Sequence, residues 1–255
     1  MNKLIDTDPK KAAWIAIGVL LVVLILLPGP KKIGVTPLES EALPPTTRTE
    51  TVMEETPKHL IDVEYPALEG LQDDRLESQV NDIIKREVLD SIAVFKKESS
   101  GLGDEGQSEV RVRYEVAYLN PSILSLGLEY STYTAGAAHP FNYMTTMNFD
   151  LRNGERLALK DLFMADSEHL KVLSEAAKKE LDARFPGGDD GQVWDEDGAL
   201  PTAVNYEEFL ITREGLTVIF NPYQVAAYAA GTQRIKVPHA LLSPYVDPSG
   251  VLAAR

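Results

Sequence analysis

The feature that most constrains the fold of this chain is an alternation of apolar and polar residues between Ser108 and Phe163. Three runs there place apolar side chains at nearly every second position, within residues 110–118, 124–130 and 141–151. A period of two is typical of β-strands and puts the apolar side chains on one face. Because the other face is polar, the pattern predicts antiparallel strands that are covered on one side only.

The third run is followed by Asn153-Gly154, a pair that tolerates positive φ at both positions and predicts a tight hairpin. Residues 156–159 then return as a fourth strand. Shorter strands are expected elsewhere in the chain, at residues 60–65, 209–212, 216–220 and 235–238.

Two segments have apolar residues at helical spacing, residues 76–95 and residues 170–185. Asp73 or Asp74 can cap the first helix, and Asp166 can cap the second. A half-covered sheet and two amphipathic helices combine most simply when the helices pack on the apolar face. The sequence therefore predicts an α+β domain, an antiparallel sheet with two amphipathic helices packed on one face.

The N-terminal part of the chain predicts a membrane anchor. Residues 1–11 form a short polar head, and residues 12–27 are uninterrupted apolar sequence, about 24 Å long as a helix. Residues 28–56 contain five prolines and are expected to be a disordered stalk, with the folded domain at 57–250. A cleaved signal peptide is the alternative, but no small-x-small cleavage pattern follows the apolar run. We expect a single-pass protein of the bacterial inner membrane with its C-terminal domain outside the cytoplasm.

Composition narrows the classes of function. The 255 residues have a formal net charge of −14, which disfavours nucleic acid and attracts cationic partners. The chain has no cysteine, which removes thiol catalysis and thiolate zinc sites, and its four histidines lack metal-ligand spacing. Neither a nucleophile elbow nor a phosphate-binding loop occurs in the sequence. We therefore expect no metal and no cofactor, and the sequence identifies no catalytic residues.

The order of several short motifs resembles a known family. A tyrosine-rich strand enters the loop Gly136-Ala137-Ala138-His139, and an aromatic strand, Asn153-Gly154 and Leu157-x-Leu-x-Asp-Leu-Phe163 follow. After a helix come Phe220-x-Pro-Tyr223 and Tyr228-x-x-Gly231. This arrangement is similar to the extracytoplasmic domain of RsiV-type anti-sigma factors and PdaC-type peptidoglycan deacetylases. The similarity covers about residues 57–245, and it departs from the family loop in lacking a further glycine at Ala137 or Pro140.

The resemblance implies an extracytoplasmic binding domain. In RsiV-type proteins this domain binds lysozyme, and a cytoplasmic segment restrains a sigma factor. The expected cytoplasmic head of this chain, residues 1–11, is too short for that second role. A deacetylase domain is not visible after Arg255. The resemblance thus implies the binding half of these proteins without the output half.

Candidate ligand-binding residues lie in two segments. His139 occupies a loop of small residues, where it either contacts a ligand or holds the loop by bonding backbone carbonyls. Tyr133 and Tyr130 alternate in one strand, so one of them is expected to face outward. Core positions are expected for Tyr130, Phe141 and Tyr143. Tyr223, after Pro222, is either an exposed interface anchor or a core tyrosine in a turn. The full candidate set is Tyr133, His139, Pro140, Asn142, Pro222 and Tyr223.

We predict a membrane-anchored binding module of the bacterial envelope that recognises a lysozyme-like cationic protein or peptidoglycan. Two alternatives stay open from the sequence. Carboxylates are abundant, but the sequence does not show which of them lie close together. The first alternative is therefore a peptidoglycan-active hydrolase that uses a pair of carboxylates. An envelope signalling or assembly protein, whose transmembrane helix recruits partners, is the second.

Overall fold

The computed structural model describes residues 44–101, 106–187 and 193–253, which all lie in one compact unit, Ala42–Arg255. The head predicted at 1–11, the membrane helix predicted at 12–27 and residues 28–43 of the predicted stalk lie outside the described residues. None of the helices in the described ranges is long and apolar enough to cross a membrane.

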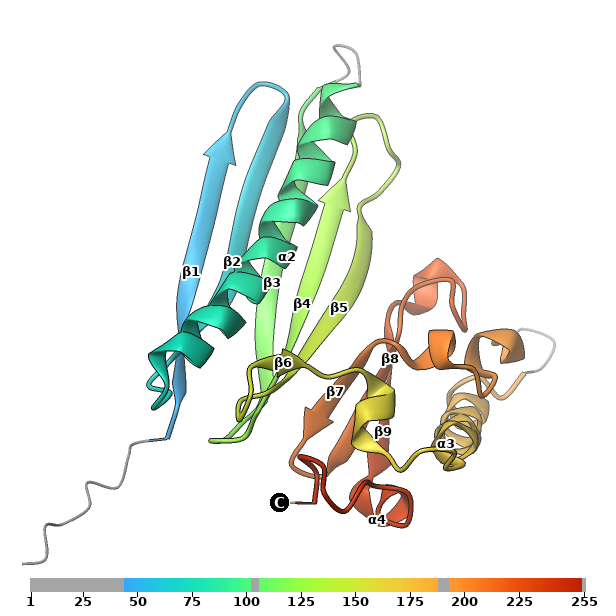
Figure 1. The fold of residues 1–255 in the computed structure, drawn as a ribbon. Helices are drawn as coiled ribbons and strands as arrows, with labels where there is room; N and C mark the ends of the chain where they lie inside the picture. Colours follow the sequence, from blue (N-terminus) through green and yellow to red (C-terminus); the bar gives the residue numbers. More distant parts are fainter. Residues whose placement is uncertain (1–43, 102–105, 188–192, 254–255) are drawn as a thin grey trace, which may run out of the picture. The chain divides into compact units, whose positions relative to one another are not determined.

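A six-stranded sheet with strand order β1-β2-β3-β4-β5-β6 forms the first layer (Figure 1). Its strands are β1 (Thr46–Glu55), β2 (His59–Glu69), β3 (Ser108–Leu119), β4 (Ile123–Tyr133), β5 (Phe141–Asp150) and β6 (Glu155–Arg156). The prediction of a purely antiparallel sheet is wrong, because β2 and β3 pair in parallel. Helix α2 (Asp74–Ser100) connects these two strands and returns the chain to the end at which β2 began, which parallel neighbours require.

Strand β1 corrects the predicted boundary between stalk and domain. Residues 46–55, assigned from the sequence to a disordered stalk, pair antiparallel with β2 along the whole strand, from Thr46 opposite Glu69 to Glu55 opposite Leu60. The strand is polar because it lies at the sheet edge, and Val52 packs against the core. Its threonines and Val52 nevertheless favour an extended backbone. The domain therefore includes residues 46–55.

Helix α2 covers one face of the six-stranded sheet, as predicted (Figure 1). The Asp73 side chain caps it by accepting hydrogen bonds from the N–H groups of Arg75 and Leu76, at 2.9 and 3.3 Å. Its apolar face, which includes Val80, Ile84 and Val88, packs into a core with β2, β3, β4 and β5.

The second helix does not join α2, which corrects the predicted packing. Helix α3 (His169–Arg184) packs instead against a separate three-stranded antiparallel sheet of β7 (Phe209–Thr212), β8 (Gly215–Phe220) and β9 (Gln233–Pro238). A short helix, α4 (His239–Leu242), adjoins this sheet. Asp166 is not the cap; it has φ +57°, and α3 begins after Glu168 without a side-chain cap.

The predicted two-residue hairpin at Asn153-Gly154 is also wrong. The pairing of Asp150 with Glu155 leaves a four-residue connection, and of the predicted pair only Gly154 has positive φ, +75°. Strand β6 is correspondingly short, and residues 159–162 form a 3-10 helix, η1 (Leu159–Leu162), rather than the end of a strand.

The two sheets meet through polar side chains of β4 and β5. The N–H groups of Phe209 and Ile211 on β7 donate to the hydroxyl groups of Thr146 and Ser125, at 3.0 and 2.8 Å. The amide of Asn148 donates to the carbonyl of Phe209 at 2.8 Å. The polar face of β4 and β5 is therefore covered, and its side chains supply the partners that the edge strand β7 needs.

A candidate recognition surface

The loop between β4 and β5, residues 134–140, carries His139 on the surface. Gly136 has φ +85°, in the left-handed region that glycine occupies without strain. The Nδ1 atom of His139 lies 2.9 Å from the carbonyl oxygen of Pro140, so the histidine does bond a backbone carbonyl. Its ring is exposed and stacks on Tyr228, with centroids 4.5 Å apart and an interplanar angle of 22°. The histidine thus shapes the loop and also contributes to an aromatic surface.

Tyr228 is the residue that joins the two predicted site segments. It begins the 3-10 helix η4 (Tyr228–Ala230), and its hydroxyl group donates a hydrogen bond to the carbonyl of Pro140. The side-chain amide of Asn142 donates to the same hydroxyl oxygen at 3.2 Å. The ring also lies 6.1 Å from Phe141 and 5.7 Å from Tyr223. Tyr228 therefore holds the His139 loop, the start of β5 and the Tyr223 turn together.

Tyr223 projects from a strained turn. Its φ of +72° is rare for a bulky residue, and its exposed fraction is 65%. The turn is held at both ends: Pro222 is buried, and the N–H of Tyr223 donates to the carbonyl of Ala226 at 3.0 Å. Strained, exposed residues of this kind persist where the surroundings over-determine them and concentrate at ligand sites. The interpretation of Tyr223 as an exposed residue is confirmed. Its role in binding stays a prediction.

Asn221 fixes this turn to the open edge of β5. Its Oδ1 accepts from the N–H of Met144, and its Nδ2 donates to the carbonyl of Met144, each at 2.8 Å. The side chain thereby pairs with the strand as a neighbouring strand would. This contact explains how a turn near residue 222 is positioned beside the start of β5.

The aromatic contacts continue from the surface into the core. Phe141 lies 5.8 Å from Tyr143, and Tyr143 stacks on Tyr130 with centroids 4.7 Å apart at 3°. Burial raises the pKa of Tyr130 and raises that of Tyr143 to about 12, so both phenols are neutral at physiological pH. We refer to these six rings as the aromatic cluster: Tyr130, His139, Phe141, Tyr143, Tyr223 and Tyr228.

Of the six residues predicted from the sequence, four contact Tyr228, namely His139, Pro140, Asn142 and Tyr223, and Pro222 is the buried neighbour of Tyr223. Tyr133 is the exception: it ends β4 opposite Glu109, is half-buried, and makes none of the ring contacts of the cluster. The sequence also misassigned Phe141 to the core, whereas 43% of it is exposed. Tyr228 was missed as a site residue, although its position in the Tyr-x-x-Gly motif was a usable signal.

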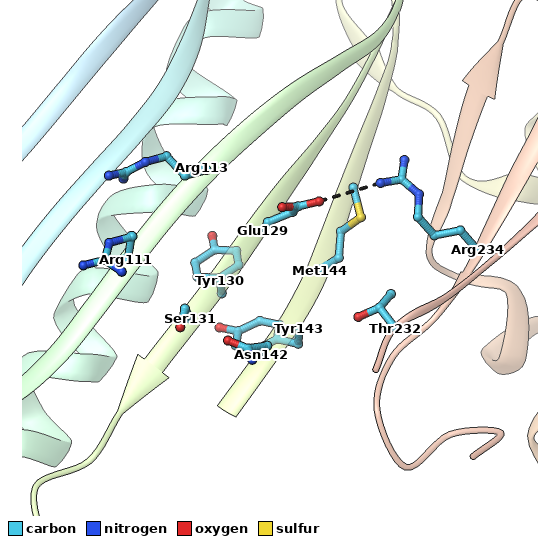
Figure 2. Close-up of a pocket in the computed structure, with 10 residues that line it drawn as sticks. All are labelled: Arg111, Arg113, Glu129, Tyr130, Ser131, Asn142, Tyr143, Met144, Thr232 and Arg234. Atoms are coloured by element: carbon cyan, nitrogen blue, oxygen red, sulfur yellow. Dashed lines mark ion pairs between the residues drawn. The ribbon is translucent and has the colours of Figure 1, made fainter. Parts of the chain in front are cut away.

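A polar groove adjoins the aromatic cluster on the face of the six-stranded sheet opposite α2. Figure 2 shows its floor on β3, β4 and β5 and its wall at Thr232 and Arg234. The cavity has a volume of about 300 Å³ and is lined by Arg111, Arg113, Glu129, Tyr130, Ser131, Asn142, Tyr143, Met144, Thr232 and Arg234. Two residues of the cluster, Tyr130 and Tyr143, are also part of the groove lining, but their rings pack in the core that includes α2. Asn142 of the lining bonds to Tyr228, so the groove and the cluster are adjacent.

The arginines of the groove have carboxylate partners. Arg234 lies 3.7 Å from Glu129 (Figure 2). It also pairs with Glu115. Arg113 donates to Asp62 at 2.6 Å, and this hydrogen bond lowers the pKa of Asp62. These pairs are half-exposed, so water and ligand groups compete for them at little cost. The groove therefore offers guanidinium donors and carboxylate acceptors without a large local net charge.

Within the described ranges, no group of three His, Asp or Glu residues is arranged to hold a metal ion. What the described geometry does define is a mixed-sheet α+β domain with a rigid, exposed aromatic surface beside a polar groove. That combination is suited to recognition of a flat or extended ligand.

Comparison with known proteins gives two family matches within this domain. Residues 52–142 match the model "Deacetylase PdaC", and residues 160–240 match "Protein of unknown function (DUF3298)". Crystal structures of DUF3298 family proteins from Pseudomonas aeruginosa and Bacteroides fragilis share the fold. Each has a TM-score of 0.55, with 15% and 17% identity over 80% and 82% of this chain and 95% and 96% of those chains.

Three curated relatives are similar in sequence. The anti-sigma-V factor RsiV of Bacillus subtilis is 28% identical over 75% of this chain and 67% of its own length. The peptidoglycan-N-acetylmuramic acid deacetylase PdaC of the same species is 26% identical over 71% of this chain but only 37% of that enzyme. The immunogenic protein MPT64 of Mycobacterium tuberculosis is 27% identical over 42% of this chain and 46% of its own length. The resemblance predicted from the motifs, to a domain shared by RsiV and PdaC, is confirmed.

Proposed function

We propose that this chain is a membrane-anchored binding module of the bacterial envelope, and that the aromatic cluster is its recognition surface. The observation that carries the proposal is the convergence of two distant segments, one with His139 and one with Tyr223 and Tyr228, into one surface of contacting rings. Residues 12–27 would anchor the chain in the membrane, with the domain on the extracytoplasmic side.

The preferred ligand is a cationic, lysozyme-like protein. Exposed tyrosine and phenylalanine are typical anchors of protein interfaces, and Tyr223 and Phe141 are 65% and 43% exposed. The net charge of −14 would steer a cationic protein toward the domain. The similarity to RsiV supports the same choice.

Peptidoglycan is the second candidate, and the groove beside the cluster favours it. Aromatic rings stack on sugar faces, while Arg111, Arg113 and Arg234 can bind carboxylates such as those of a muramyl peptide. The similarity to PdaC, whose name denotes action on peptidoglycan, is consistent with this ligand.

Binding measurements on the full chain test the proposal. Affinity for a cationic lysozyme and retention on purified cell-wall sacculi are measured for the wild type, Tyr223→Ala and Tyr133→Ala. Tyr133 is the matched control, because it is a tyrosine near the loop but outside the cluster. We expect Tyr223→Ala to weaken binding roughly tenfold or more, as for an interface anchor, and Tyr133→Ala to have little effect.

Two results distinguish the two ligands: how strongly binding depends on salt, and whether the protein is retained on sacculi or binds lysozyme. Lysozyme binding should weaken steeply as salt rises, since it depends on the charge of the domain. If neither lysozyme nor sacculi bind at low salt, or if both tyrosine variants behave alike, the aromatic cluster is not the recognition surface.

A further inference from the structure

A second, larger cavity lies away from the aromatic cluster. Its volume is about 620 Å³, and it is enclosed by β5, the segment from β6 to η1, the start of α3 and the segment that leads into β7. Much of its lining is apolar, including Leu157, Leu159, Leu170 and Phe209. A cavity of this size and character is typical of small-molecule sites.

Two carboxylates are in this lining, the exposed Glu207 and the half-buried Glu208, and one oxygen of Glu208 has no protein donor among the described residues. The N–H and the hydroxyl group of Thr146 donate to Oε2 of Glu208, at 2.5 and 2.8 Å. The other oxygen, Oε1, accepts no hydrogen bond from the described residues and is not a buried unpaired atom. It is therefore available to a ligand in the cavity. Burial raises the pKa of Glu208, whereas the bonds from Thr146 oppose that rise.

Several other polar groups of the lining are occupied by protein partners. The hydroxyl group of Tyr206 donates to the carbonyl of Ala199 at 2.8 Å, and the amide of Asn148 donates to Phe209. Arg156 donates to the carbonyl of Thr146 at 3.0 Å and lies 3.4 Å from Glu87. These contacts leave Glu208 Oε1 as an acceptor of the lining to which none of the described residues donates.

The charged and titratable neighbours of Glu208 are Arg156, Glu207, Lys160 and His169. Arg156 stabilises the ionised form of Glu208, and Glu207 destabilises it. Lys160 is exposed. Burial lowers the pKa of His169, so its ring is neutral near pH 7. Arg156 is thus already engaged by other protein groups and Lys160 is exposed, and neither donates a hydrogen bond to Glu208 among the described contacts.

We propose that this cavity binds a small amphiphilic molecule with one ammonium group, which donates to Glu208 Oε1 while its apolar body packs on Leu157, Leu170 and Phe209. An ammonium donor matches an acceptor-only carboxylate and forms a charge-assisted bond, stronger than one from a neutral hydroxyl group. The site is separate from the aromatic cluster, so it does not depend on the function proposed there.

Calorimetric titration of the full chain with a matched ligand series tests the proposal. The probes are 4-phenylbutylammonium, the neutral 4-phenylbutanol and the anionic 4-phenylbutanoate. We expect the ammonium probe to bind roughly tenfold or more tightly than either analogue, the size of a charge-assisted hydrogen bond. The preference should decrease as the pH falls and Glu208 is protonated.

Three variants make the outcome specific. Glu208→Gln keeps a bond acceptor for Thr146 and should abolish the preference for the ammonium probe. Glu207→Gln removes the same charge from the adjacent, exposed residue and should leave most of the preference. Ala203→Trp, at an exposed position of the lining, should block all three probes without unfolding the protein. Equal binding of the three probes, an unchanged preference in Glu208→Gln, or unimpaired binding in Ala203→Trp would each overturn the proposal.

Discussion

Replacing Asn221 by alanine tests how the recognition surface is attached to the sheet. The side chain makes two hydrogen bonds to the backbone of Met144, each 2.8 Å long, on a strand edge that is otherwise open there. Met144 is 2% exposed, so its N–H and carbonyl groups would lose their partners with limited access to water. An unsatisfied buried group costs about 1–3 kcal/mol, and we therefore expect Asn221→Ala to lower the free energy of unfolding by about 2–4 kcal/mol.

Equilibrium urea unfolding measures this change, with the dependence on denaturant unchanged from the wild type. Asn153→Ala is the matched control, because among the described contacts the Asn153 side chain bonds only to Glu155, within an exposed turn. Its loss should cost about 0.5–1 kcal/mol or less. Since Asn221 also begins the Tyr223 turn, the variant should lose ligand affinity as well. A stability loss equal to that of the control would show that water replaces Asn221 readily, and that the turn is not fixed by this pairing.

Three further predictions concern backbone strain, pH and capping. Gly215→Ala should lower the free energy of unfolding by about 2–3 kcal/mol or more in a denaturant titration. The reason is that φ is +153° and a Cβ atom would lie 2.1 Å from the carbonyl oxygen of Val237. Near-native stability of this variant would contradict the argument. Burial raises the pKa of Glu208, so its contribution to stability is full below the unfolded-state pKa and is lost as the pH rises through the folded-state value. The wild type should thus lose stability relative to Glu208→Gln across that window, and parallel pH profiles would refute the assignment. Asp73→Ala should cost about 1 kcal/mol in the same titration, with Asp73→Asn close to wild type; equal losses in both would rule out a capping role.

The sequence predicted those features that depend on local contacts. The α2 helix and its Asp73 cap follow from spacing within a few residues, and the strands β7 and β8 follow from the two short apolar runs at 209–212 and 216–220. The recognition surface was only partly predictable. His139 and Tyr223 could be singled out by composition. The contacts that bring them together could not, because the ring of His139 and the amide of Asn142 reach Tyr228 from segments 86 or more residues away. The positive φ of Tyr223 could not be predicted, because a tyrosine in the sequence does not indicate a left-handed backbone.

The error in placing the second helix and the second sheet has a physical source, which the residue types along the polar face could have revealed. A period-two pattern tells which side chains share a face but not whether that face is in water. On β3 the polar face carries Arg111 and Arg113, long charged residues that are 48% and 38% exposed. On β4 and β5 the same face carries Ser125, Thr146 and Asn148, each at most 4% exposed and bonded to the backbone of β7. Short side chains that donate and accept can be buried at low cost when a strand edge supplies their partners, whereas guanidinium groups need water or a paired charge. The change from charged to short polar residues across the sheet therefore marks where the second sheet covers it. It also explains why α3 packs elsewhere. Helix α2 covers the apolar face of the six-stranded sheet, and the three-stranded sheet that α3 packs on covers the polar face, which the sequence pattern had suggested was in water.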